Sequence, residues 1–433
     1  MRRPLYGWLV SEAVSLTGTR VSMLALPYFV LVTTDSPVRT GLVALFEMVP
    51  LIVLKVLGGP IIDRVGARRV SITCDVGSLV VVGSIPLLYD AGLLRFGALL
   101  ALVALAGALR GPGDAAKSAI VPALVASAQV PMERATGLHA TVERTATMLG
   151  AIIAGSLVAV VGAANALLVD AASFGLSALV LAWATASMRR PSRPSGQGAG
   201  GVEGAEEEAD PLPYRAQLAA GWHFLRGDRV LLGIAFMVAL TNMIDAAYTS
   251  VLMPVWARTW GGGPAALGVV FAVFGGFAAL GAICAATWGA RLPRYATYLV
   301  TFLVCGSPRF FVLAWDNPLW AVLAIAAASG FGSGFINPIL GAVIYERIPA
   351  PLVGRVSSLI TALCFALMPI GPLLGGTLVS GAGLAVAMLV AGSAYFLVTM
   401  LPAVDPKWRE IDRRPGEVEP AGDSAAPAAP LVS

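Results

Sequence analysis

The chain has 433 residues, of which 57% are hydrophobic and only 12% are charged. Soluble globular domains carry about 25% charged residues, so this composition excludes a water-soluble protein and predicts one that is dissolved in lipid. The net charge of +4 is small and spread over many polar segments, which argues against a nucleic-acid-binding protein. Four cysteines without metal-ligand spacing and only two histidines lead us to expect no metal site and no cofactor.

Apolar stretches long enough to cross a bilayer recur along the whole chain. A helix needs about 20 apolar residues to cross the hydrocarbon core. This length predicts twelve transmembrane helices, near residues 6–33, 40–62, 70–90, 93–116, 135–161, 164–187, 230–257, 264–288, 296–315, 318–345, 354–379 and 382–402. The first stretch lacks a small-residue cleavage site, so we expect a retained helix and not a signal peptide.

Basic residues are distributed unevenly between the two sides of the membrane. If both termini are cytoplasmic, the inner segments hold 21 of the 29 Lys and Arg residues, the outer loops hold three, and five fall within spans. An excess of Lys and Arg marks cytoplasmic loops, so this orientation is the predicted one.

Two polar segments divide the chain further. The longest is rich in Gly, Pro and charge and separates the sixth and seventh spans, and its last part has the pattern of a helix lying on the membrane surface. The other is a Pro- and Ala-rich tail. The predicted organisation is a six-helix half over 1–187, a cytoplasmic linker with an interfacial helix over 188–229, a second six-helix half over 230–402, and a disordered cytoplasmic tail over 403–433.

The two halves also repeat each other. Shifting the first two spans by 227 positions, and spans four to six by 221, brings Gly and Pro residues into coincidence. The coincident pairs include Pro37 with Pro264, Gly41 with Gly268, Gly150 with Gly371, Gly155 with Gly376 and Gly162 with Gly383. Because six helices are an even number, the halves have parallel topology and an axis along the membrane normal relates them.

The stretch "GGPIIDRVGARRV" crowds charges into the short connection between the second and third spans. Gly66 permits a tight turn, and Asp63 can meet a helix N-terminus and a nearby arginine. The stretch closely resembles the loop signature of the major facilitator superfamily, in which such a cluster latches the two halves in the outward-facing state. The resemblance implies a conformational latch formed by Gly59, Asp63, Arg64, Gly66, Arg68 and Arg69. The alternative is that these basic residues merely obey the positive-inside rule.

The resemblance covers nearly the whole chain and implies an all-α integral membrane protein with the major facilitator fold. The segments "SLTGTRVSMLALPYFVL", "VDAASF" at Asp170 and "GRVSSL" are similar to the macrolide-efflux and siderophore-export branch of bacterial drug:proton antiporters. The fifth span, "LGAIIAG", departs from the exporters' pattern because it lacks a proline; "IGPLLGG" stands in span eleven instead.

The resemblance therefore implies a monomeric secondary transporter in the bacterial cytoplasmic membrane. It would export a hydrophobic or amphiphilic small molecule, such as a drug, an antibiotic or a siderophore, by alternating access in exchange for protons. Proton-coupled uptake of a small solute and a non-transporting membrane sensor are the alternatives. An enzyme is not expected, because no nucleophile–base set or metal constellation is present.

Polar residues inside the spans are the candidates for proton and substrate binding, since such residues usually face a cavity or a partner. These candidates are Arg20, Glu47, Arg110, Asp114, Glu143, Asn242 and Asp245. Glu143 and Asp245 are the first choices for carrying the proton, with a structural ion pair or interhelix contact as the alternative role. Arg110 and Asp114 share one helix face and can pair with each other, and Asp75 is expected to belong to the latch.

Overall fold

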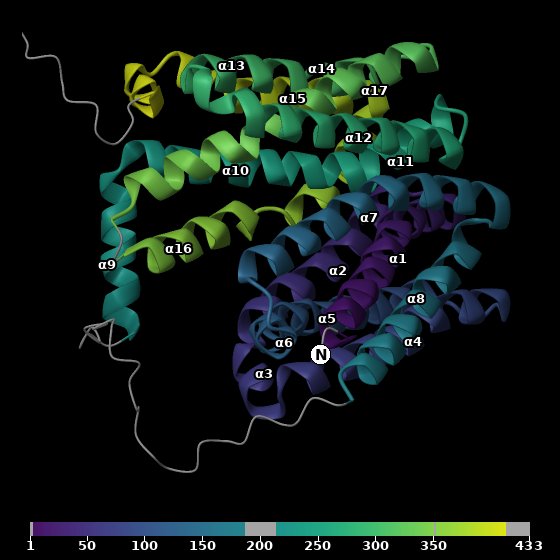
Figure 1. Cartoon of the computed structure of the whole chain (residues 1–433). Helices are drawn as coiled ribbons and strands as arrows, with labels where there is room; N and C mark the ends of the chain where they lie inside the picture. Colours follow the sequence, from purple (N-terminus) through teal and green to yellow (C-terminus); the bar gives the residue numbers. More distant parts are fainter. Residues whose placement is uncertain (1–2, 187–213, 350–351, 413–433) are drawn as a thin grey trace, which may run out of the picture.

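The computed structural model describes residues 3–186, 214–349 and 352–412, and all regular structure within them is helical. The first half of the chain contains α1 (Arg3–Thr34), α2 (Pro37–Leu57), α3 (Gly59–Val65), α4 (Ala67–Asp90), α5 (Phe96–Ala119), α6 (Val121–Ala128), α7 (Met132–Val161) and α8 (Ala163–Ala184). They form the purple-to-blue bundle of Figure 1. Of the linker predicted over 188–229, the part from 188 to 213 lies outside the described residues.

The second bundle begins after α9 (Tyr214–Gly227), the helix predicted to lie on the membrane surface. Its helices are α10 (Arg229–Ala247), the π-helix η1 (Tyr248–Leu252), α11 (Met253–Thr259), α12 (Pro264–Trp288), η2 (Gly289–Arg291), α13 (Arg294–Cys305), α14 (Pro308–Phe311), α15 (Leu319–Arg347), α16 (Val353–Ala366) and α17 (Ile370–Met400). Two short 3-10 segments, η4 (Leu401–Ala403) and η5 (Pro406–Asp412), follow.

The described residues account for the twelve predicted spans. Ten stretches are long and apolar enough to cross a bilayer. One of them, Val356–Ala403, contains two spans, because Gly383 with a φ of +83° turns the chain inside α17. The remaining span, predicted near 296–315, is formed by α13 and α14. Each is too short to cross the bilayer alone, because the helix breaks at Gly306.

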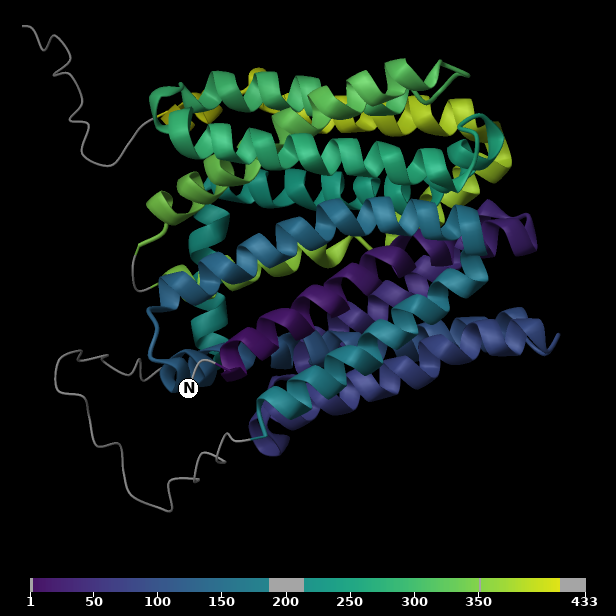
Figure 2. The same cartoon turned by 45° about the vertical axis from the view of Figure 1, so that its right-hand side comes forward.

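The two bundles meet at one end and diverge at the other (Figures 1 and 2). Where they meet, α1, α2 and α7 pack against η1, α11, α12 and α17. Leu31 and Val43 share one buried core there with Val251 and Trp256. At the other end each bundle has its own core, around Leu124 in the first and around residues of α16 in the second. We call the end where the bundles meet the closed end. The end where they diverge, which carries α3, α6 and α9, is called the linker end.

The repeated glycines explain how the closed end packs. A Cβ at Gly155 of α7 would lie 2.5 Å from Gly268 Cα of α12, and one at Gly376 of α17 would lie 2.4 Å from the carbonyl oxygen of Pro37. Real Cβ atoms do not approach so closely, so only glycine lets these backbones touch. The two contacts correspond under the sequence repeat, so the same small-residue contact is made twice around the pseudo-symmetry axis.

The beginning of the C-terminal tail, predicted to be disordered over 403–433, is ordered. Residues 406–412 are helical, and Trp408 and Ile411, three positions apart, are buried against the second bundle with exposed fractions of 7% and 1%. The expected disorder from residue 403 is therefore wrong for the first ten residues of the tail, because these two apolar side chains dock on one face. Residues 413–433 lie outside the described part.

Polar contacts fasten the same segment to the linker end of the second bundle. Asp412 accepts a hydrogen bond of 2.8 Å from the first turn of α13, at the backbone N–H of Tyr295. Arg347, at the end of α15, donates to Glu410 at 3.3 Å and to Asp228 at 2.8 Å. Asp228 in turn caps α10 by accepting from its first N–H groups. The tail thus ties together the linker ends of α10, α13 and α15.

Candidate functional site

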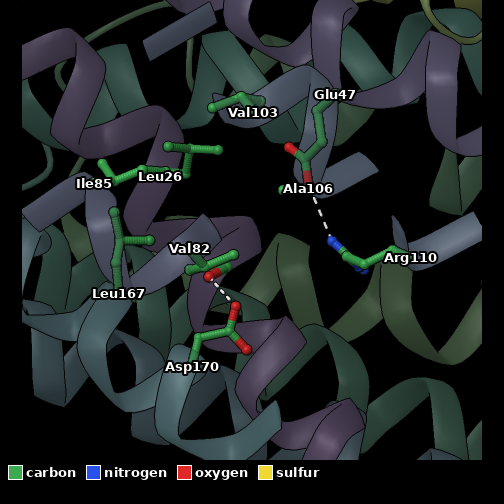
Figure 3. Close-up of a pocket in the computed structure, with 10 residues that line it drawn as sticks. Leu26, Glu47, Val82, Ile85, Val103, Ala106, Arg110, Leu167 and Asp170 are labelled. Carbon is green, nitrogen blue, oxygen red and sulfur yellow. Dashed lines mark hydrogen bonds and ion pairs between the residues drawn. The ribbon is translucent and has the colours of Figure 1, made fainter. Parts of the chain in front are cut away.

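A small cavity lies inside the first bundle, between α1, α2, α4, α5 and α8 (Figure 3). Its volume is ≈ 20 Å³, which is room for about one water molecule. Its polar lining comes from Ser22, Glu47, Arg110 and Asp170, and the rest of its wall is aliphatic. The cavity therefore brings together an arginine and two carboxylates from three helices, α5, α2 and α8, and a serine hydroxyl from α1.

Glu47 and Arg110 face each other because α2 and α5 pack backbone to backbone. A Cβ at Gly107 would lie 2.1 Å from the carbonyl oxygen of Glu47, so the glycine is what allows this approach. Arg110 Nη1 donates to Glu47 Oε1 at 3.0 Å, and both side chains are largely buried. The expected pairing of Arg110 with Asp114 on its own helix is wrong, since the carboxylate on the neighbouring helix takes the guanidinium.

Asp170 lies opposite this pair and is only 1% exposed. The Ser22 hydroxyl on α1 donates to its Oδ2. The Ser173 hydroxyl donates to the Asp170 backbone carbonyl at 2.7 Å and lies 3.3 Å from Oδ1. Among the described residues it forms no ion pair. Sequence reasoning did not select Asp170 as a site residue, although a carboxylate inside an apolar span was signal enough.

A second polar network fills the first bundle nearer the linker end. The Lys117 ammonium lies 3.1 Å from Asp75 and donates to the Ser15 hydroxyl at 2.9 Å, and the Ser177 hydroxyl donates to Asp75 at 2.7 Å. Lys117 and Asp75 are both 3% exposed. Asp75 is therefore a core residue that holds α4, α5, α1 and α8 together, and the expectation that it belongs to the latch is wrong.

In the second bundle, Asp245 of α10 pairs with Arg309 of α14. The Arg309 guanidinium is enclosed by the rings of Tyr248, Phe310 and Tyr395, whose centroids are 5.0–5.1 Å from its Cζ. Its side chain is 12% exposed, whereas that of Asp245 is 35% exposed. The arginine is thus fixed in an aromatic cage while the carboxylate stays accessible.

The backbone beside Asp245 departs from regular helix. Residues 248–252 form the π-helix η1, in which the backbone N–H of Met253 donates to the carbonyl of Tyr248. Pro254 has no N–H to donate to the carbonyl four residues earlier, which explains why the regular pattern is lost there. Single-turn π segments are frequent at functional sites. Asp245, in the last turn of α10, therefore lies directly before the irregular part of its span.

The remaining candidates lie apart from these clusters. Asn242 donates its side-chain N–H to the Cys364 carbonyl at 3.0 Å and so ties α10 to α16. Arg20 is half-buried, with Nη1 3.6 Å from Met23 Sδ, and interacts electrostatically with Glu143. Glu143 is exposed on α7. The structure therefore does not bring Glu143 and Asp245, the two first choices, together.

The predicted latch residues occupy α3 and the turn that follows it. Gly59 begins α3, and Gly66, with a φ of +95°, makes the expected turn into α4. Arg68 donates to the Thr185 hydroxyl at 2.7 Å and to the Ala182 carbonyl at 3.1 Å, so it binds the end of α8 in its own bundle. Three further latch residues are exposed and form no ion pair among the described residues: Asp63, Arg64 and Arg69.

At the closed end a polar contact joins the two bundles. Arg258 of α11 donates to Asp35 Oδ1 at 2.6 Å and to the Leu31 carbonyl oxygen at 3.1 Å. Both acceptors belong to the end of α1 and the turn after it. The bundles are therefore held by a charge-assisted contact where they close and carry unpaired charges where they diverge.

The chain resembles known proteins over nearly its full length. The family model described as Major Facilitator Superfamily matches residues 8–257 and 235–431. The multidrug efflux pump Tap of Mycobacterium tuberculosis (strain ATCC 25618 / H37Rv) is 28% identical over 417 residues, 96% of each chain. The Tap of Mycolicibacterium fortuitum is 28% identical over 421 residues, 95% of this chain and 98% of the relative.

Solved structures share the fold at lower sequence identity. The nucleoside transporter NupG superposes with a TM-score of 0.70 at 12% identity, covering 92% of this chain and 98% of that one. A bacterial homologue of the iron transporter ferroportin in an inward-facing state superposes with a TM-score of 0.68 at 14% identity, covering 94% and 98%. Both structures therefore share the fold of this chain over nearly its full length.

Proposed function

Because this chain belongs to the Major Facilitator Superfamily, we propose that it is a secondary transporter that exports hydrophobic or amphiphilic compounds, including drugs, from the cytoplasm. The observation that carries the proposal is the similarity to multidrug efflux pumps over 96% of the chain. The similarity includes both bundles and so covers every helix that would line a transport pathway.

The linker end faces the cytoplasm in this proposal, in the cytoplasmic membrane of a bacterium. Arg64, Arg68 and Arg69 lie at that end, in keeping with the excess of basic residues on the inner side. Both termini and the linker over 188–229 are then cytoplasmic, and the halves over 1–187 and 230–402 are the moving bodies of a monomer. The conformation described above is inward-facing, ready to receive a compound from the cytoplasm or from the inner leaflet.

The latch role of α3 follows from this assignment. With the linker ends apart, Asp63, Arg64 and Arg69 are exposed and free to engage the second bundle when the linker end closes. Arg68 stays bound to α8 and anchors α3 to its own bundle. The cluster then stabilises the outward-facing state, while Arg258 and Asp35 stabilise the inward-facing one.

The substrate class is suggested by the second bundle. Asp245 presents a carboxylate whose side chain is 35% exposed, and an accessible negative charge inside a transport protein attracts cationic compounds. We therefore propose lipophilic cations as substrates and protons as the coupling ion, since a proton and a cation can compete for negative sites inside the protein. Asp245 and Glu143 are the proposed substrate contacts, one on each bundle.

Flux in proteoliposomes tests the proposal. The purified full-length chain would be reconstituted and assayed with ethidium, a macrolide and a siderophore, with and without an imposed pH gradient. We expect ethidium to accumulate against its gradient only when the pH gradient is present, and to dissipate that gradient. Asp245→Asn should reduce this flux, and Asp90→Asn, at the exposed end of α4, should not.

Other results would point to the alternatives. Accumulation of a solute along with protons would indicate uptake. Specific binding of a compound with no flux in either direction would indicate a membrane sensor. No binding and no flux with any member of the panel would contradict the proposed substrate class.

A further inference from the structure

We propose that Asp170, buried in the first bundle, binds and releases the proton that drives transport, and that α1 passes this change to the closed end. The inference rests on the proposed function and deepens it. It assigns the proton to a residue different from the accessible carboxylates Asp245 and Glu143.

The surroundings of Asp170 suit a carboxyl group that changes its protonation state. The side chain is buried, and its two oxygens meet the hydroxyls of Ser22 and Ser173. A hydroxyl donates to a carboxylate and accepts from a carboxylic acid, so both forms keep their hydrogen bonds. The charged form has no ion pair among the described residues, because Arg110 across the cavity is bound to Glu47, and an unpaired charge in the middle of a membrane protein is costly. Proton uptake by Asp170 therefore removes the free-energy cost of keeping an unpaired charge inside the bundle.

Glu47 is less suited to this role because its charge is already neutralised. Arg110 binds it at 3.0 Å, and removing the carboxylate's charge would leave the guanidinium buried without a partner. Of the groups facing Asp170 across the cavity, α2 contributes Glu47, α5 contributes Arg110, and α4 contributes only the aliphatic Val82 and Ile85 (Figure 3). Asp170 is thus the carboxyl group of this cavity that can be neutralised without stranding a charge.

The cavity offers a step for the proton. It has room for about one water molecule, and both Asp170 and the Glu47–Arg110 pair line it. Uptake forms one O–H bond on the Asp170 carboxylate at the expense of a hydronium ion, which becomes water. Release reverses the exchange and returns the proton to water on the other side of the membrane.

α1 connects this site to the closed end. Its backbone passes directly over Asp170, since a Cβ at Gly18 would lie 2.6 Å from Oδ1. The same helix supplies Ser22 to the carboxyl group and, nine residues later, the Leu31 carbonyl that Arg258 binds. A change in how α1 sits on Asp170 is therefore carried along a continuous helix to the contact between the bundles.

The first test separates proton coupling from substrate movement. In proteoliposomes, the full-length Asp170→Asn variant should lose accumulation of ethidium driven by a pH gradient, by at least about tenfold. Exchange of ethidium for ethidium without a gradient should stay within about twofold of the unmodified chain. Asp90→Asn is the matched control and should behave as the unmodified chain in both assays. Retained gradient-driven accumulation in Asp170→Asn would overturn the assignment.

A second test does not depend on transport. Infrared spectra of the purified protein across a pH series should contain a carboxylic-acid C=O band that Asp170→Asn removes and Asp90→Asn leaves in place. In Ser22→Ala the carboxyl group loses a hydrogen-bond partner, so the frequency of that band should change. If no band changes in either variant, Asp170 does not titrate and the inference is wrong. If the bands behave as expected but the unmodified chain moves no ethidium, the proposed function fails and the proton site stands.

Discussion

The Arg258 guanidinium lies 2.6 Å from the Asp35 carboxylate, and this contact crosses the boundary between the two bundles. Asp35 has a left-handed backbone conformation, with a φ of +51°, that points the turn after α1 toward α11. The same guanidinium also binds the Leu31 carbonyl oxygen. One residue of the second bundle thus holds two groups of the first, at the end where the bundles close.

Loss of this contact should favour opening of the closed end. The Asp35 side chain is 83% exposed, so Asp35→Asn should weaken the closed state by only about 0.5 kcal/mol, and Arg258→Gln, which removes both contacts, by more. Spin labels at the exposed Thr33 and Thr259, after replacement of the native cysteines, would report the distance across the closed end. We expect a larger open fraction in the order unmodified, Asp35→Asn, Arg258→Gln. An unchanged distance distribution in Arg258→Gln would show that packing alone keeps this end closed.

Adding a methyl group where Gly155 meets Gly268 should open the closed end more than loss of the Arg258 contact does. Gly155→Ala places a Cβ 2.5 Å from Gly268 Cα, so α7 and α12 must separate at the closed end. We expect the inward-facing state to be disfavoured by about fivefold to a hundredfold and ethidium exchange to slow accordingly, because overpacking costs about 1–3 kcal/mol. Gly137→Ala on the same helix is the control, since its new methyl group meets open space. Equal exchange rates in the two variants would contradict the role given to the glycine pair.

The halves could be predicted from the sequence because the repeat is carried by residues with a direct steric role. Gly155 and Gly376 coincide in the repeat, and each is in backbone contact with the opposite bundle. Gly162 and Gly383 also coincide: Gly162 ends α7 and Gly383 turns the chain inside α17, each with a φ near +85°. Where the backbone itself demands a glycine, the pattern along the chain reports the fold.

The polar sites could be predicted only in part, because their partners lie on other helices. Arg110 pairs with a residue 63 positions away and Arg309 with one 64 positions away. Spacing along one helix, which favoured Asp114 as the partner of Arg110, carries no information on such distant contacts. The tail was missed for the same reason, since the burial of Trp408 depends on Tyr298 and Gly233.

The docked tail should contribute to the stability of the second bundle. Trp408→Ala removes a side chain that is 7% exposed and packs on Tyr298, so we expect a loss of about 3–5 kcal/mol and a lower unfolding temperature in detergent. Val404→Ala, at a site that is 80% exposed, is the matched control and should change little. Differential scanning fluorimetry of the two purified variants makes the comparison. A Trp408→Ala protein as stable as the control would mean that residues 406–412 are not docked in the membrane-extracted protein.

The two carboxylates first chosen from the sequence should differ in what their removal does. Asp245→Asn leaves the Arg309 guanidinium enclosed by aromatic rings without its counter-charge, so we expect a loss of about 3–5 kcal/mol in stability together with lost transport. Glu143 is exposed, so Glu143→Gln should unfold at the same temperature as the unmodified chain and affect only the binding of cationic compounds. The double variant Asp245→Asn with Arg309→Gln should recover part of the lost stability, because no buried charge is then left alone. Thermal unfolding and ethidium binding, measured on all three variants, test this difference. A Glu143→Gln protein destabilised as much as Asp245→Asn would contradict the prediction.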